Sequence, residues 1–168
     1  MSVVVLDLKT IFTTENSKLA VQTEFDLSSE EFGGVCPLSK PVVVTGGVEN
    51  RAGVVYLNLV CQVWYQANCD RCGTFCGKSY NVPIERVLVT EQESEENDLL
   101  LLVPSMQLDL FELCYGEIVL SVPTKYLCKE DCKGICQTCG ANLNTEPCGC
   151  SNQTVDPRLA ALQALLED

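Results

Sequence analysis

The feature that most constrains this chain is a crowded group of cysteines near its carboxyl end. Six of the twelve cysteines fall between residues 128 and 150. Within this stretch Cys136 and Cys139 are followed by Gly140, which is the spacing of a metal knuckle whose backbone N–H groups turn toward the sulfurs. Four thiolates gathered in this way suit a tetrahedral Zn²⁺ ion. We therefore expect one tightly held structural zinc, bound by four of the six cysteines in this stretch. Cys136 and Cys139 are the surest ligands. The six candidates are Cys128, Cys132, Cys136, Cys139, Cys148 and Cys150.

The alternative is a disulfide cluster, and the cell compartment separates the two interpretations. The sequence starts without a cationic segment, and its first apolar run stops at Asp7, which is not the pattern of a signal peptide. No apolar stretch approaches the roughly 20 residues of a membrane span. We therefore expect a cytoplasmic protein with no membrane association, in which thiols stay reduced and clustered cysteines bind metal. Because the chain has no histidine, cysteine must supply such a site, alone or with a carboxylate.

A second set of cysteines lies in the middle of the chain, at Cys69, Cys72 and Cys76. The first two again have knuckle spacing, with Gly73 behind them. Three interpretations compete: a tight structural hairpin, half of a second metal site completed by Cys76 or by the carboxyl-terminal cysteines, and a redox pair. Thioredoxin-type chemistry places Cys-x-x-Cys at the start of a helix, where the helix dipole lowers the thiol pKa, whereas β patterns flank this pair. The hairpin is the favoured interpretation.

Alternation of apolar and polar residues predicts a sheet over most of the chain before the carboxyl-terminal cysteines. Residues 54–66 show it most clearly, since the odd positions place Cys61 in an apolar row that we assign to the core. Asp109 has the position of a helix cap, and Pro123 ends the helical pattern. The apolar face of this helix is expected at Phe111, Tyr115, Ile118, Val119 and Val122.

These patterns predict an α+β fold: a mostly antiparallel, barrel-like sheet with one main helix, a cysteine-rich zinc module and a short terminal helix. We expect a β-rich domain over 1–124 with the helix at 109–122, the zinc module at 125–150, and a linker with an amphipathic helix at 151–168. Asp156 and Pro157 begin that last helix. Its apolar stripe consists of Leu159, Leu162, Leu165 and Leu166.

The charge of the chain indicates its partners. Twenty-three acidic residues against eleven basic ones leave a formal net charge of −12. Such a surface repels phosphate, so direct RNA binding is expected to be weak or absent, and a basic protein is a better partner. The acidic stretch 91–98 and the terminal leucine stripe are the expected contact surfaces. No paired carboxylates, Ser/His arrangement or phosphate-binding glycine loop indicates an enzyme or a small-molecule substrate.

The sequence also resembles the YceD family, the large ribosomal RNA subunit accumulation proteins of bacteria and plastids. The similarity is carried by Cys69-x-Arg71-Cys72, by Asp109-Leu110 leading to Val122-Pro123, by the run from Leu127 to Asn144 with Cys148 and Cys150, and by Asp156-Pro157-Arg158-Leu159-Ala160. This resemblance implies a non-catalytic ribosome biogenesis factor that promotes accumulation or processing of the large-subunit (23S) ribosomal RNA. Its expected partner is a basic large-subunit ribosomal protein or a pre-ribosomal particle.

Two other functions stay open at this point. One is a thiol–disulfide oxidoreductase that uses Cys69 and Cys72. The other is a zinc-knuckle adaptor unrelated to ribosomes. Reduction of a model disulfide by the first of these would distinguish it from both binding functions.

Overall fold

The computed structural model describes residues 4–32, 34–91 and 99–150. The chain forms two compact units. Unit 1 comprises Met1–Ala67 and Cys76–Thr124, and unit 2 comprises Asn68–Phe75 and Lys125–Asp168. The expected contact surface at 91–98, apart from Glu91, and the expected linker and terminal helix at 151–168 lie outside the described residues.

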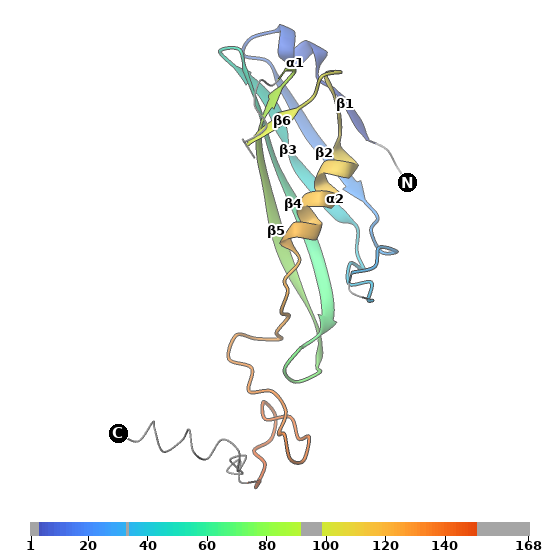
Figure 1. Ribbon diagram of the computed structural model, residues 1–168, viewed down its shortest axis with the longest axis vertical. Helices are drawn as coiled ribbons and strands as arrows, with labels where there is room; N and C mark the ends of the chain where they lie inside the picture. Colours follow the sequence, from blue (N-terminus) through green and yellow to red (C-terminus); the bar gives the residue numbers. More distant parts are fainter. Residues whose placement is uncertain (1–3, 33, 92–98, 151–168) are drawn as a thin grey trace, which may run out of the picture. The chain divides into compact units, whose positions relative to one another are not determined.

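Unit 1 is built on a five-stranded sheet with the order β2-β3-β4-β5-β6 (Figure 1). Its strands are β2 (Lys18–Phe25), β3 (Val42–Arg51), β4 (Val54–Asn68), β5 (Phe75–Val89) and β6 (Leu100–Leu102). The β2–β3 and β3–β4 pairs are antiparallel, and β6 joins β5 in parallel. The sheet curls like half of a barrel and leaves β2 and β6 as edges (Figure 1). The predicted α+β fold with a barrel-like sheet is thus confirmed.

Three short elements close one end of unit 1. Strand β1 (Val5–Asp7) pairs with β7 (Gln107–Asp109) in a separate antiparallel sheet, and α1 (Lys9–Thr13) follows β1 directly. The backbone N–H of Leu8 donates to Met106 O at 2.8 Å, and that of Leu110 donates to Val4 O at 3.0 Å. Hydrogen bonds between distant segments therefore stabilise these elements. Each is too short to show a hydrophobic periodicity in the sequence.

The main helix α2 (Leu110–Ser121) begins where the capping pattern predicts. The Asp109 carboxylate accepts from the backbone N–H groups of Phe111 and Glu112 at 2.9 and 3.2 Å. This bond satisfies two of the N–H groups that a helix start leaves unpaired. The helix covers one face of the sheet (Figure 1).

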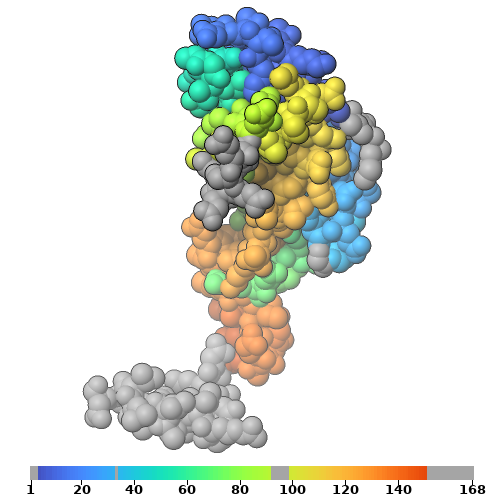
Figure 2. Space-filling model, turned by 45° about the horizontal axis from the view of Figure 1, so that its top comes forward, coloured from blue at the N-terminus to red at the C-terminus, as the bar shows by residue number. Residues whose placement is uncertain are grey.

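The predicted apolar face of α2 is partly wrong. The fully buried positions are Leu110, Cys114 and Ile118, one helical turn apart, whereas Val119 is 41% exposed. Cys114 accounts for the shift, because a free thiol packs as a small apolar side chain. Phe111 and Tyr115 border the buried face and stack on each other at 6.0 Å between ring centroids. The loop before β3 lies against this side of α2, where Tyr115 donates to Glu30 (Figure 2).

The buried row of β4 matches its prediction. Val55, Leu57, Leu59, Cys61, Val63 and Tyr65 are all buried. The turn between β3 and β4 is a two-residue hairpin in which Ala52 and Gly53 have φ values of 51° and 86°. Both residues adopt the left-handed region that this tight turn requires. Asn50 holds the turn, because its Oδ1 accepts from Gly53 N at 2.9 Å.

Asn50 is the only buried polar side chain among the described residues of the core, at 2% exposure. Its Nδ2 donates to Ile11 O at 2.7 Å, which ties α1 to β3. We predict that Asn50→Ala lowers the free energy of unfolding by about 2 kcal/mol, because it leaves the Ile11 carbonyl without this buried donor. Urea unfolding measures the change. Asn81→Ala, at an exposed position of β5, is the control and should stay within about 0.5 kcal/mol of the natural chain.

Candidate metal centre

Unit 2 joins two segments that are distant in sequence: residues 68–75 between β4 and β5, and residues 125–150. Asp70 and Tyr126 hold them together through two hydrogen bonds. The Asp70 carboxylate accepts from Tyr126 N at 2.6 Å, and Asp70 N donates to Tyr126 O at 2.8 Å. Arg71 adds a third bond, from Nη1 to Cys132 O at 2.9 Å. These bonds bring the Cys69 knuckle against the start of the carboxyl-terminal cysteine stretch.

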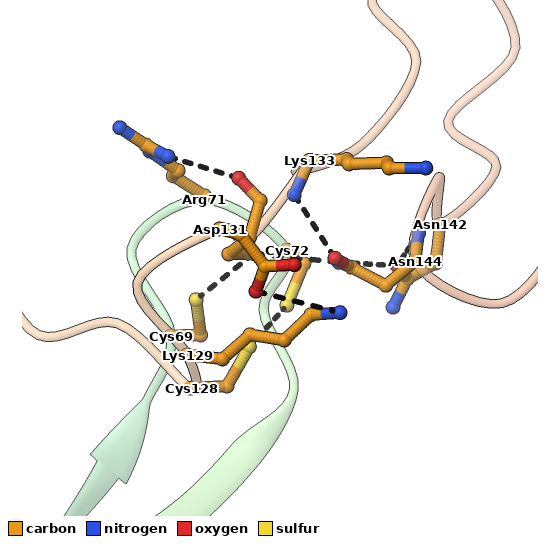
Figure 3. A network of polar contacts seen from close by, with 10 residues as sticks. Cys69, Arg71, Cys72, Cys128, Lys129, Asp131, Lys133, Asn142 and Asn144 are labelled. Carbon is orange, nitrogen blue, oxygen red and sulfur yellow. Dashed lines mark hydrogen bonds and ion pairs between the residues drawn. The ribbon is translucent and has the colours of Figure 1, made fainter.

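The first cysteine group consists of Cys69, Cys72, Cys128 and Cys132. All four sulfurs lie within 4.8 Å of one another. The Sγ atoms of Cys69 and Cys132 are 3.7 Å apart, as are those of Cys72 and Cys128. Figure 3 shows the sulfurs of Cys69, Cys72 and Cys128 turned toward a common centre. Each segment of unit 2 thus supplies two sulfurs.

The second cysteine group consists of Cys136, Cys139, Cys148 and Cys150. Its sulfurs also lie within 4.8 Å of one another. All four come from one stretch of fifteen residues, and residues 140–147, which we call the linking loop, connect its two halves. This group is more open than the first, since Cys139 is exposed whereas Cys136 is buried.

The two groups share one local structure. In the first, Gly73 N donates to Cys69 O at 2.8 Å and Cys69 N donates to Thr74 O at 2.9 Å. In the second, Gly140 N donates to Cys136 O at 2.9 Å and Cys136 N donates to Ala141 O at 2.8 Å. Both glycines have positive φ, at 69° and 74°. Glycine adopts this conformation without strain, which is why it follows the second cysteine of each knuckle.

The distances fit a metal ion and not a disulfide. A tetrahedron of sulfurs about 2.3 Å from a central zinc ion has edges of about 3.8 Å. The measured separations of 3.7 Å match that edge, and a disulfide would need about 2.05 Å. None of the twelve cysteines, all of which lie in the described part of the chain, forms a disulfide. Each group can therefore hold one metal ion, and a set of four thiolates is the donor chemistry that Zn²⁺ prefers.

The acidities of the thiols also favour a cation. Burial raises the pKa of Cys69, but hydrogen bonds from the backbone N–H groups of Cys128, Cys72 and Arg71 outweigh it and lower that pKa to about 6. Those of Cys139 and Thr138 lower the pKa of Cys136 to about 6. By contrast, burial and the neighbouring Cys132 sulfur raise the pKa of Cys128 to about 12. Each group thus stabilises one thiolate, whose negative charge then opposes ionisation of the neighbouring thiols. A divalent cation would offset this repulsion between thiolates.

The structure distributes the predicted site residues as follows. It places Cys128 and Cys132 with Cys69 and Cys72, and the other four carboxyl-terminal cysteines form their own group. Cys76 belongs to neither group and lies in unit 1, in β5. Cys61 and Cys114 are buried in unit 1, where their mutual hydrogen bond raises the pKa of Cys114.

Polar residues that were not predicted from the sequence surround the sulfurs of the first group. Asn144 Nδ2 lies 3.3 Å from Cys132 Sγ, and Thr74 Oγ1 lies 3.3 Å from Cys72 Sγ. Asn142 and Asn144 approach the first group from the linking loop (Figure 3). The Asn-Leu-Asn pattern at 142–144, just after a knuckle, was the available signal, because asparagine in a short loop usually bonds to nearby backbone.

Comparison with protein families gives one match that covers most of the chain. The family model described as "Large ribosomal RNA subunit accumulation protein YceD" matches residues 57–166. That range includes most of β4, the whole of β5 and α2, and both cysteine groups.

Individual relatives have low sequence identity to this chain. The "Large ribosomal RNA subunit accumulation protein YCED homolog 1, chloroplastic" of Arabidopsis thaliana is 24% identical over 162 residues, covering 78% of this chain and 50% of that protein. Uncharacterized proteins of Mycobacterium tuberculosis and Mycobacterium bovis are 32% identical over 77 residues, covering 46% of this chain and 36% of theirs. The chain thus spans half or less of the length of these relatives. No solved structure matches it.

The Asp70–Tyr126 pairing predicts a local effect on unit 2. We expect Asp70→Ala to speed amide hydrogen exchange at Tyr126 by about five- to tenfold, because a hydrogen bond from a backbone N–H to a carboxylate contributes about 1 kcal/mol or more. Exchange measured by mass spectrometry or NMR tests this. Asp131→Ala is the control, since that exposed carboxylate lies 3.7 Å from Lys129 Nζ and forms no other ion pair among the described residues. Equal exchange in both variants would contradict the role of Asp70.

Proposed function

Because this chain belongs to the YceD family, we propose that it is a non-catalytic ribosome biogenesis factor that promotes accumulation or processing of the large-subunit (23S) ribosomal RNA. The observation that carries the proposal is the family match over residues 57–166, which includes the whole region of clustered cysteines. The name of the Arabidopsis relative points to the same role for that protein. The proposed location is the cytoplasm, where the particles it serves are assembled. No helix among the described residues is long and apolar enough to cross a membrane.

We propose that the protein acts mainly through protein contacts and binds RNA weakly or not at all. Its net charge of −12 opposes a phosphate backbone. Several of its few cations are also engaged within the chain: Lys18 and Arg51 pair with Glu49, and Arg86 pairs with Glu117. Lys40 lies over the Trp64 ring, 4.0 Å from its centroid. A basic large-subunit ribosomal protein, free or in a pre-ribosomal particle, is the partner that this charge favours.

The metal groups have a structural role in this proposal. We propose that two Zn²⁺ ions are bound, one by Cys69, Cys72, Cys128 and Cys132, the other by Cys136, Cys139, Cys148 and Cys150. Four thiolates leave no open coordination position, which is the arrangement of structural and not of catalytic zinc. The ions would fix the fold of unit 2 and present its surface to a partner.

An oxidoreductase is less well supported. Cys69 and Cys72 are 3% and 9% exposed, so a disulfide substrate has little access to their sulfurs. They also lie in the connection between two strands and not at a helix start. The low pKa of Cys69 has a sufficient explanation in metal binding, which requires thiolates.

Metal content tests the zinc assignment. We predict two equivalents of zinc per chain in protein purified without added metal, and one equivalent in Cys72→Ser, because three sulfurs hold the ion much less tightly than four. Cys76→Ser is the matched control, because Cys76 lies nearby in β5 and outside both groups, and it should keep two equivalents. Elemental analysis gives the numbers. Loss of one equivalent in Cys76→Ser would contradict the assignment of the first group.

Binding experiments test the proposed function. We predict that the tagged chain, purified from its native cells, carries large-subunit ribosomal proteins or pre-ribosomal particles with it. In a second experiment at physiological salt, the purified chain is titrated with a naked large-subunit RNA fragment and, separately, with the ribosomal proteins found. Binding to a basic protein, with weak RNA binding, is the expected result. Sub-micromolar RNA binding that falls steeply with salt would contradict the protein-contact mechanism, since that salt dependence is the mark of phosphate contacts.

A further inference from the structure

The two cysteine groups are connected by side chains that neither group uses as ligands. The linking loop lies between Cys139 and Cys148, so its ends are set by sulfurs of the second group. Its asparagines, however, bond to Cys132 of the first group and to Thr74, which contacts Cys72 of that group. The linking loop therefore belongs to the second group by its place in the sequence, while its side chains contact the surroundings of the first group.

Asn144 makes the direct connection. Its Nδ2 lies 3.3 Å from Cys132 Sγ, and its Oδ1 accepts from Lys133 N at 2.9 Å (Figure 3). The second contact fixes the orientation of the amide, because a backbone N–H can only donate and so must face the oxygen. The nitrogen then faces the sulfur, and Asn144 donates a hydrogen bond to Cys132.

Asn142 makes a second connection through Thr74. Its Oδ1 accepts from Asn144 N at 3.0 Å, which fixes this amide in the same way. Its Nδ2 therefore donates to Thr74 Oγ1, at 3.3 Å, and Thr74 Oγ1 lies 3.3 Å from Cys72 Sγ. A hydroxyl that accepts from Asn142 keeps its own proton available for the Cys72 thiolate. The loop thus reaches one sulfur from each segment of the first group.

The backbone fixes the loop in place between the two groups. Leu143 N donates to Gly134 O at 2.9 Å, and Ile135 and Asn142 form an antiparallel bridge. Gly134 has a φ of 76°, and a Cβ there would lie 3.1 Å from Arg71 O. The chain between Cys132 and Cys136 therefore has little freedom to move without moving the loop, Arg71 or both.

We propose that the linking loop couples the two metal sites, so that an ion in the second cysteine group raises the affinity of the first. Binding at the second group closes the loop at both ends and holds Asn142 and Asn144 in the conformation that donates to the first group. Donors around a thiolate spread its charge and fix its direction, and their loss typically weakens metal binding by about 10- to 100-fold. Asn142 and Asn144 are positioning residues, since they act on the ion through Cys72 and Cys132. The coupling is reciprocal by thermodynamic necessity.

This inference rests on the proposed metal binding, and the experiment separates the two. Zinc affinities of the full, reduced chain are measured by competition with a chromophoric chelator. Cys148→Ser with Cys150→Ser disables the second group and isolates the first, and Cys69→Ser with Cys72→Ser isolates the second. We expect each isolated group to bind zinc about tenfold or more weaker than it does in the natural chain, by the same factor for both.

Asn144→Asp then tests the route of the coupling. The carboxylate keeps the shape of the side chain and still accepts from Lys133 N. It can donate neither to Cys132 nor to Asn142 Oδ1, to which Asn144 Nδ2 also donates at 2.9 Å. In this background, disabling the second group should change the affinity of the first by less than about twofold, in contrast to the tenfold change expected from the loss of outer hydrogen bonds in the natural chain. Asn144→Ser is a second, smaller change with the same expectation. Asn81→Asp, with the same change of charge on β5, should keep the full coupling.

Cobalt binding supplies an independent readout. Co²⁺ in four thiolates has a sulfur-to-metal charge-transfer band, and we expect Asn144→Asp to shift the band of the first group because the N–H···S bond is gone. Two equivalents of zinc bound with affinities that do not depend on each other would overturn the coupling alone. A natural chain that binds no zinc would overturn the metal proposal and the coupling together.

Discussion

The local structure of unit 2 depends on the convergence of four sulfurs on one point from two segments of chain. Without a cation this arrangement is unfavourable, since ionised thiols 3.7 Å apart repel each other. Backbone groups stabilise this arrangement of sulfurs. Two knuckle turns have glycine at positive φ, and backbone N–H groups favour one thiolate in each group. The protein part of the site is therefore a preformed receptor for charge of the opposite sign.

The two units differ in the interactions that stabilise them. Unit 1 holds a sheet, a capped helix and an apolar core, with one buried asparagine that ties α1 to the hairpin turn. Among the described residues of unit 2, a small buried cluster around Cys69, Cys72 and Cys132 takes the place of a core. A unit of this size cannot bury enough apolar surface to fold on that basis, which is the usual reason for metal in small folds. This member of a family named for ribosomal RNA accumulation thus combines a unit with an apolar core and a unit whose cysteine groups can hold metal ions.

Local signals were readable from the sequence, and long-range ones were not. The cap at Asp109 and the alternation along β4 were predicted because the responsible residues are neighbours in the sequence. The second cysteine group lies within fifteen residues, so its knuckle was visible as well. The partners of Cys69 and Cys72 were left open, because their choice depends on Asp70 meeting Tyr126 across 56 positions. The short elements β7 and α1 were not predicted for the same reason. Cys114 shifted the buried face of α2, because a buried thiol packs as an apolar side chain.

The 56-residue separation between Cys72 and Cys128 has a further consequence for the unfolded chain. The segment between them contains β5, β6, β7 and α2, which is most of the second half of unit 1. An ion bridging these cysteines acts as a cross-link that ties the segment into a ring and removes conformational freedom from the denatured ensemble. By the relation used for disulfides, a ring of this size is worth about 4 kcal/mol, if the ion stays bound when the chain unfolds. The metal would then stabilise a sheet that contributes none of its ligands.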